Sequence, residues 1–150
     1  MKLKYDEFKI NKIEQKNKFL HKNGETAKEK EKKYILIVDD EAIIRDLVSD
    51  VLKENDYDIL TAANGEEGLE IYKKNQQIID LIILDIIMPG ISGGELFKLI
   101  REINPDMKII ITSGYSKQKV TKTIMASGAN GFLPKPFNIN KLLELVNTTI

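Results

Sequence analysis

The sequence predicts one α/β domain built on a parallel, doubly wound sheet, preceded by a polar leader. Five short apolar runs recur along residues 34–150, and each is followed by a segment with helical spacing. Strands that are buried on both faces of a parallel sheet read as unbroken Ile, Leu and Val runs, as these do. The length of 150 residues suits a single domain. We therefore expect parallel strands joined by right-handed helical crossovers.

The first half of the domain contains two strand–helix pairs. YILIVDD (34–40) is an apolar run that ends in acids, and the following helix, 41–55, carries Ile43, Ile44, Leu47, Val48, Val51 and Leu52. These six residues recur at the three- and four-residue spacing of a helix. YDILTAA (57–63) is the second strand. Asn64-Gly65 then opens the second helix, 65–75.

The second half repeats the pattern with three more strands and three more helices. In chain order these are DLIILD (80–85), the helix 93–103, MKIIIT (107–112), the helix 116–128, GFL (131–133) and the helix 138–150. Asn138 is the expected N-cap of the last helix because its side-chain oxygen can accept a backbone N–H of the first turn.

The charges balance overall but divide along the chain. Lysine plus arginine and aspartate plus glutamate both total 23. Residues 1–33 hold 11 lysines against 6 acids, a net charge of +5, whereas residues 34–150 hold 12 basic against 17 acidic side chains, a net charge of −5. The segment 1–33 is expected to be a basic leader or linker, partly helical or disordered. Without a basic excess, the chain is not expected to bind nucleic acid.

Composition excludes several kinds of site. The chain has no cysteine, which excludes disulfides, thiolate zinc sites and a cysteine nucleophile. Its apolar runs are far shorter than the roughly 20 residues that a membrane span needs, and no secretory h-region lies near the N-terminus. We therefore expect a cytoplasmic protein that makes no membrane contact of its own.

Acidic side chains gather at the expected carboxyl ends of two strands. Asp39, Asp40 and Glu41 end the first strand, and Asp85 ends the third. Doubly wound sheets place their sites at these ends, so the carboxylates are expected to meet. A helix cap explains one such acid, but not a pair beside another from a second strand. Mg²⁺ and the nearby Lys135 would offset the repulsion, as in metal-assisted phosphoryl transfer.

Four motifs carry a family resemblance: IVDDE (37–41), LDIIMPGISGGEL (84–96), IITSGY (110–115) and GFLPKPF (131–137). In this order, they resemble the receiver domain of two-component response regulators, both stand-alone and attached to hybrid sensor histidine kinases. The resemblance covers residues 34–150. It implies a flavodoxin-like sheet of strand order 2-1-3-4-5 with five helices. It also implies that an aspartate receives a phosphoryl group from a histidine kinase or phosphotransfer protein.

The resemblance assigns roles to individual residues. Asp85 matches the phosphoacceptor. Asp39 and Asp40 match the acids that bind Mg²⁺, together with Asp85 itself and the backbone carbonyl of Ile87. Water attack on the phosphorylated aspartate is modulated at the positions of Ile87 and Tyr115. An aliphatic Ile87 cannot orient a water and Tyr115 can cover the site, so a long-lived phosphorylated state is expected.

Three further residues match the part of the family's site that stabilises phosphate and switches the domain. Ser113 matches the hydroxyl that moves toward the phosphoryl group, Lys135 the salt-bridging lysine and Phe132 the aromatic switch. The Lys135–Pro136 bond is a candidate for the cis form. The surface expected to change comprises the helix 116–128, the strand 131–133 and the helix 138–150.

Other functions stay open at this stage. An Mg²⁺-dependent phosphatase of the haloacid-dehalogenase type also uses a strand-end aspartate, but it has a second aspartate two residues later, where this chain has Ile87. A docking domain that has lost phosphorylation is the other alternative, and the complete set of acids, hydroxyl and lysine argues against it. Beyond its own phosphorylation and dephosphorylation, no catalysis is expected. The downstream protein partner, a phosphorylation-dependent homodimer and attachment to a kinase remain open.

Overall fold

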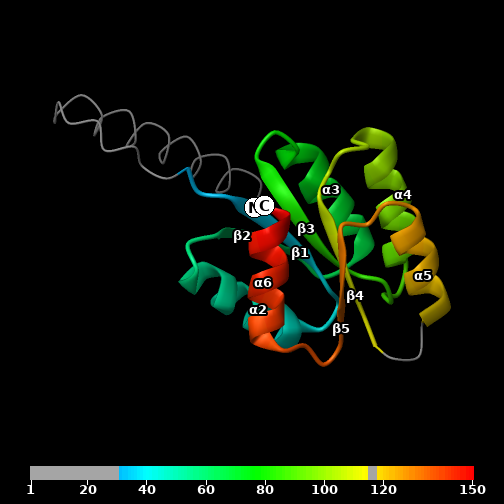
Figure 1. Cartoon of the computed structure of the whole chain (residues 1–150). Coiled ribbons are helices and arrows are strands. Elements are labelled where there is room, and N and C mark those ends of the chain that lie inside the picture. The colour runs from blue at the N-terminus through cyan, green and yellow to red at the C-terminus, as the bar shows by residue number, and fades with distance from the viewer. Residues whose placement is uncertain (1–30, 115–117) are drawn as a thin grey trace, which may run out of the picture. The chain divides into compact units, whose positions relative to one another are not determined.

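A computed structural model describes residues 31–114 and 118–150 of the chain. Its strands form one parallel sheet with the order β2-β1-β3-β4-β5, as expected (Figure 1). The five strands are β1 (Tyr34–Val38), β2 (Asp58–Ala62), β3 (Ile79–Asp85), β4 (Ile109–Ser113) and β5 (Gly131–Pro134). All of them lie within residues 32–150, which form one compact unit.

Helices alternate with these strands along the described chain, as predicted. They are α2 (Ala42–Glu54), α3 (Gly65–Asn75), α4 (Gly93–Ile103), α5 (Gln118–Ala126) and α6 (Ile139–Thr149). The Asn138 side chain accepts the backbone N–H groups of Asn140 and Lys141, which confirms the predicted N-cap of α6. No helix in residues 31–114 or 118–150 combines the length and the apolar character needed to cross a membrane.

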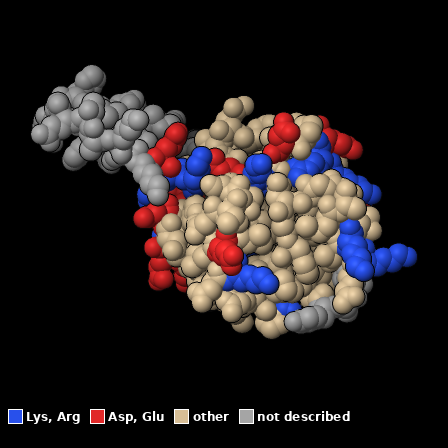
Figure 2. Space-filling model, in the orientation of Figure 1, with Lys and Arg blue, Asp and Glu red and all other residues tan. Residues whose placement is uncertain are grey.

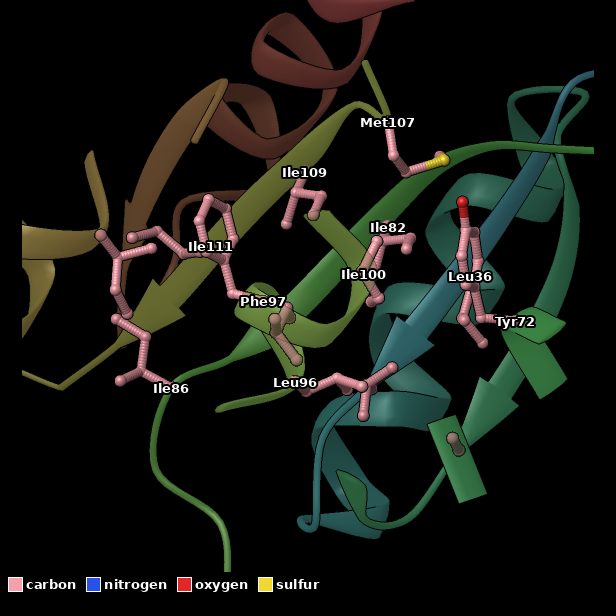
Figure 3. Close-up of a cluster of buried hydrophobic side chains, with 14 of the residues drawn as sticks. Leu36, Tyr72, Ile82, Ile86, Leu96, Phe97, Ile100, Met107, Ile109 and Ile111 are labelled. Atoms are coloured by element: carbon pink, nitrogen blue, oxygen red, sulfur yellow. The ribbon is translucent and has the colours of Figure 1, made fainter. Parts of the chain in front are cut away.

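The sheet is buried on both faces, in agreement with its unbroken apolar runs. Leu36, Ile82 and Ile109 point to one face, where α3, α4 and α5 cover them with residues such as Tyr72 and Phe97 (Figure 3). Neighbouring strand residues point to the other face, where they meet α2 and α6 in a second core. Its fully buried members are Ile35, Ile37, Val48, Leu52, Leu81, Ile83, Ile110, Leu133, Leu142 and Val146.

Strand β4 lies later in the chain than the hydropathy pattern predicts. The expected strand 107–112 is observed as Ile109–Ser113. Met107 is buried but precedes the strand, whereas Ser113 is in register with Pro134 of β5. The backbone N–H of Lys135 also donates to the Ser113 carbonyl, at 2.8 Å. Pairing with the neighbouring strand, and not apolar character, therefore sets where β4 ends.

Candidate functional site

The acids predicted to meet do lie together at the carboxyl edge of the sheet. Strands β1 and β3 are adjacent, and Val38 pairs with Leu84. Asp39 and Asp85, the residues that follow, are therefore neighbours. Carboxylate oxygens of Asp39, Asp40, Glu41 and Asp85 all lie within 4.8 Å of one another. Asp39 and Asp85 are buried, whereas Asp40 and Glu41 are exposed.

Hydrogen bonds to β2 and to the start of α2 hold Asp39 in place. Its N–H donates to the Ala62 carbonyl of β2 at 3.2 Å, so β2 fixes the turn after β1. Its Oδ1 accepts the Glu41 N–H at 2.9 Å, and its carbonyl accepts a guanidinium N–H of Arg45 at 2.7 Å. This carboxylate is thus oriented before any ligand arrives.

Asp85 is fixed from both directions along the chain. Its Oδ1 accepts the Ile87 N–H at 3.1 Å, which folds the following loop back onto the carboxylate. The next N–H, of Ile86, donates to the Thr112 carbonyl of β4 at 3.0 Å. Helix α4 begins so close to this segment that a Cβ on Gly93 would overlap the backbone oxygen of Asp85. A glycine is therefore required where α4 starts.

Lys135 binds three of the clustered acids at once. Its Nζ lies 2.8 Å from Asp39 Oδ2, 3.0 Å from Glu41 Oε1 and 3.1 Å from Asp85 Oδ2. The lysine side chain is only 15% exposed, so its ion pairs with the buried Asp39 and Asp85 are sheltered from water, whereas Glu41 is exposed. The Lys135–Pro136 peptide bond is cis, as the resemblance implies. One ammonium group therefore connects the ends of β1, β3 and β5.

Burial and neighbouring charges shift the pKa values of Asp85 and Lys135. Burial raises the pKa of the Asp85 carboxyl from 3.8 to about 6, and the Asp39 charge adds to this, although the Ile87 N–H and Lys135 oppose it. For Lys135, burial lowers the pKa, but the hydrogen bonds that its ammonium donates to the three carboxylates outweigh this effect and leave the pKa above its usual value. The site thus holds a firmly charged ammonium beside an acid that resists ionisation.

The donor set fits a small, hard cation. Mg²⁺ prefers oxygen ligands, and carboxylates are among those that proteins supply. Carboxylate oxygens of the four acids lie within 4.8 Å of one another, so they are close enough to share one ion. Four carboxylates also face a single ammonium, which leaves negative charge for a divalent cation to neutralise.

The predicted switch residues lie at the ends of β4 and on β5. Ser113 is fully buried, and its hydroxyl donates to the Gly114 carbonyl at 3.2 Å. Thr112 is also buried and pairs with Asp85 across the sheet. Phe132 is partly buried and packs against the core that α3, α4 and α5 cover. The structure brings Lys135 to the acids, while the roles of Ser113 and Phe132 stay predictions.

The structure describes only one of the two residues that are expected to modulate water attack. The Ile87 side chain is 45% exposed, and it follows Asp85 at the edge of the acidic cluster. Its backbone N–H contacts Asp85, whereas the predicted role of its carbonyl as a metal ligand stays a prediction. Tyr115 lies outside the described residues, as does the start of the helix expected at 116–128.

Three residues make contacts at the site that were not predicted. Glu41 pairs with Lys135, and Arg45 holds the Asp39 carbonyl. Glu66, in the first turn of α3, accepts the Ile91 N–H at 3.1 Å and so ties α3 to the loop after Asp85. Gly90 in that loop has a φ of 77°, and a Cβ there would meet the Glu66 carboxylate. The only signal in the sequence for these three residues was a charge near the start of the helix that follows a strand.

The chain matches known receiver proteins over the whole region that contains this site. Residues 35–147 match the family model described as the response regulator receiver domain. The chemotaxis protein CheY of Bacillus subtilis (strain 168) is 35% identical over 117 residues, which are 77% of this chain and 96% of that protein. The sensor kinase CckA of Brucella abortus (strain 2308) is 34% identical over 112 residues, which are 75% of this chain but 12% of the kinase.

The solved structures agree with the sequence relatives. A response regulator receiver domain protein from Clostridium thermocellum has a TM-score of 0.76 and 33% identity to this chain. The match covers 79% of this chain and 94% of that one. The chemotaxis protein CheY4 of Vibrio cholerae has a TM-score of 0.73 and 32% identity. The chain belongs to the response regulator receiver family of two-component signal transduction.

Proposed function

We propose that Asp85 is the residue of this receiver that accepts the phosphoryl group, with a histidine kinase or a phosphotransfer protein as donor. One observation carries the proposal: the buried Asp85 carboxylate lies 3.1 Å from the Lys135 ammonium and in one cluster with the carboxylates of Asp39 and Asp40. Among the described acids, only Asp39 and Asp85 combine burial, a contact with Lys135 and a place in the cluster, and Asp85 is the one that matches the family's phosphoacceptor. At neutral pH Asp85 is ionised despite its raised pKa, because that pKa is about 6.

The proposed transfer exchanges one bond to phosphorus for another. An oxygen of Asp85 forms a bond to phosphorus, the bond from phosphorus to the donor's imidazole nitrogen breaks, and the imidazole leaves with that electron pair. Negative charge on the equatorial oxygens is then stabilised by the Lys135 ammonium and the Ser113 hydroxyl. Mg²⁺, held by Asp39, Asp40, Asp85 and the Ile87 carbonyl, would neutralise the same oxygens when bound.

The proposed output follows from the new charge on Asp85. Ser113 turns toward the phosphoryl oxygens, and the space that it leaves admits the Phe132 ring. The surface that changes comprises α5, β5 and α6. These elements face the viewer in Figure 1, and Figure 2 shows that uncharged side chains cover most of that face. A face with few charges suits a protein partner or a second phosphorylated copy.

Phosphorylation of Asp85 can be tested by intact-mass spectrometry. With acetyl phosphate and Mg²⁺, the chain is expected to gain the mass of one phosphoryl group, and Asp85→Asn is expected to abolish the gain. Asp106→Asn is the matched control, because Asp106 is exposed and precedes β4, at the opposite edge of the sheet. A phosphorylated Asp85→Asn protein would place the acceptor elsewhere. An unmodified wild-type chain would favour a docking domain that has lost phosphorylation.

The Ile87 side chain is expected to prolong the phosphorylated state. It is exposed at the edge of the acidic cluster, and an aliphatic group cannot orient a water for attack on phosphorus. Ile87→Asn supplies a hydrogen-bonding group there and should speed phosphate release by about threefold to tenfold, less than full general acid–base catalysis provides. The measurement is a phosphate-release time course after removal of the donor. An equal or slower decay of Ile87→Asn would contradict this role.

The remaining assignments are proposals of lesser detail. The receiver is proposed to occupy residues 34–150, after a basic leader at 1–33 of which residues 1–30 lie outside the described structure. Its catalysis is proposed to be limited to its own phosphorylation and dephosphorylation. The phosphatase alternative is not proposed, since Ile87 has no carboxylate to act as the second acid. A cytoplasmic location stays the prediction made from composition.

A further inference from the structure

A groove of about 360 Å³ lies between α4 and α5, away from the acidic cluster. The two helices lie next to each other on one side of the sheet (Figure 1). Phe97 and Ile124 are buried at the groove, whereas Val120 is 41% exposed. Gly94 carries no side chain on the α4 wall, and a Cβ there would lie 3.7 Å from Ile124. The groove therefore presents apolar surface between two helices.

The polar side chains that line the groove are mostly engaged within their own helices. The Thr123 hydroxyl donates to the Lys119 carbonyl at 3.0 Å, and the Ser127 hydroxyl donates to the Thr123 carbonyl at 2.9 Å. The Glu95 carboxylate accepts the Ser92 N–H at 3.0 Å, completing a capping box at the start of α4. Its negative charge is thereby directed at the helix terminus. An occupant would thus meet apolar atoms and few unused polar ones.

Each wall of the groove carries a lysine, and the α4 wall carries Glu95 as well. Lys98 lies on the α4 wall and Lys119 on the α5 wall, and both side chains are exposed. Within residues 31–114 and 118–150, neither lysine forms an ion pair. Helix α5 carries Lys119 and Lys122 and contains no acid. With one unpaired ammonium group on each side of the apolar surface, the groove would attract a ligand that has both acidic and apolar groups.

We propose that this groove binds an acidic amphipathic helix of a partner protein. Such a helix places apolar side chains one turn apart in a hydrophobic groove and turns its charged side chains to the rim. The α5 wall runs from Lys119 to Ser127, nine residues that rise about 12 Å, so it matches a segment of two to three helical turns. The groove is distinct from the phosphoacceptor site, and binding there does not require phosphorylation of Asp85.

The test uses the full chain and a defined synthetic helix. The probe is a fluorescein-labelled 14-residue peptide with leucines one turn apart and glutamates elsewhere, and its twin carries lysine in place of every glutamate. Fluorescence anisotropy is expected to show saturable binding of the acidic peptide alone. The double variant Lys98→Glu/Lys119→Glu should weaken binding by about tenfold or more, and added salt should weaken it in the wild type.

Two controls make the result specific to the groove. Lys122→Glu removes one positive charge from the same helix at a position that does not line the groove, so its effect should be about twofold at most. Amide chemical-shift changes on peptide addition should concentrate on α4 and α5. The proposal is overturned if the acidic peptide does not bind, if the lysine twin binds equally, or if the double variant behaves like Lys122→Glu. It is also overturned if the shift changes fall on another face.

Discussion

Replacing Lys135 with methionine is expected to lower the free energy of unfolding by about 2–4 kcal/mol in metal-free buffer at neutral pH. Methionine retains much of the length and apolar character of the lysine stem but removes the ammonium that binds Asp39, Glu41 and Asp85. Two of those carboxylates are only 5% exposed, so water cannot replace the lost partner. The native state would then contain uncompensated buried charge.

Urea denaturation in the presence of EDTA measures this loss. Lys141→Met is the matched control, because Lys141 is an exposed lysine on α6 and its replacement should change stability by less than about 0.5 kcal/mol. Adding Mg²⁺ should recover part of the deficit of Lys135→Met, since a bound cation compensates the same carboxylates. Equal stability of Lys135→Met and Lys141→Met in EDTA would show that the three ion pairs make no net contribution.

The grouping of acids and lysine follows from the sequence because topology dictates it. Asp39 and Asp85 each follow an apolar run, and the carboxyl ends of adjacent parallel strands share one edge of the sheet. Lys135 follows the fifth run and reaches the same edge. No knowledge of side-chain conformation is needed for these residues to meet. This part of the site was accordingly predictable at the level of single residues.

The contacts made by Glu41 and Arg45 depend on side-chain conformation and were not predictable in that way. Glu41 is exposed, and nothing in its position favours an ion pair with Lys135 over solvation. Arg45 reaches back across the first turn of α2 to the Asp39 carbonyl, a contact that depends on the angle between β1 and that helix. Such contacts are decided by tertiary geometry, which a one-dimensional pattern does not contain.

Helix α2 shows a different limit of the apolar pattern. Six apolar residues recur at helical spacing in it, yet only Val48 and Leu52 of these are fully buried. Ile43 is 81% exposed and Leu47 is 44% exposed. The apolar stripe is wider than the strip of sheet that the helix covers, so periodicity predicts the helix but not which edge of its stripe is buried.

Replacing Asp85 with asparagine is expected to have the opposite effect, raising the free energy of unfolding in EDTA at neutral pH by about 1–2 kcal/mol. The pKa of this carboxyl rises from 3.8 to about 6 on folding, so its ionised form is less favourable in the native state than in the unfolded one. A two-unit shift corresponds to about 3 kcal/mol, and solvent screening reduces the expected gain. Asparagine keeps an oxygen that can accept from Ile87 or Lys135.

The pH dependence separates this explanation from a simple packing effect. A carboxyl whose pKa is raised on folding stabilises the native state fully below its unfolded pKa, and that contribution is lost as pH rises through the folded value. The advantage of Asp85→Asn should therefore be small near pH 4, grow through pH 6 and then level off. Urea denaturation in EDTA across this range, with Asp106→Asn as control, measures it; a pH-independent gain would point to packing instead.

Magnesium should narrow the difference in stability that EDTA reveals. The ion binds ionised carboxylates, so the wild type gains about 1.4 kcal/mol when Mg²⁺ is at ten times its dissociation constant. Asp85→Asn lacks one charged ligand and should gain less. The Asp85 carboxylate thus lowers the stability of the metal-free protein, and Mg²⁺ binding to the same carboxylate offsets that loss. This behaviour is expected of a functional acid, whereas a structural acid would stabilise the protein without metal. An Asp85→Asn gain that survives saturating Mg²⁺ unchanged would contradict the assignment of Asp85 as a metal ligand.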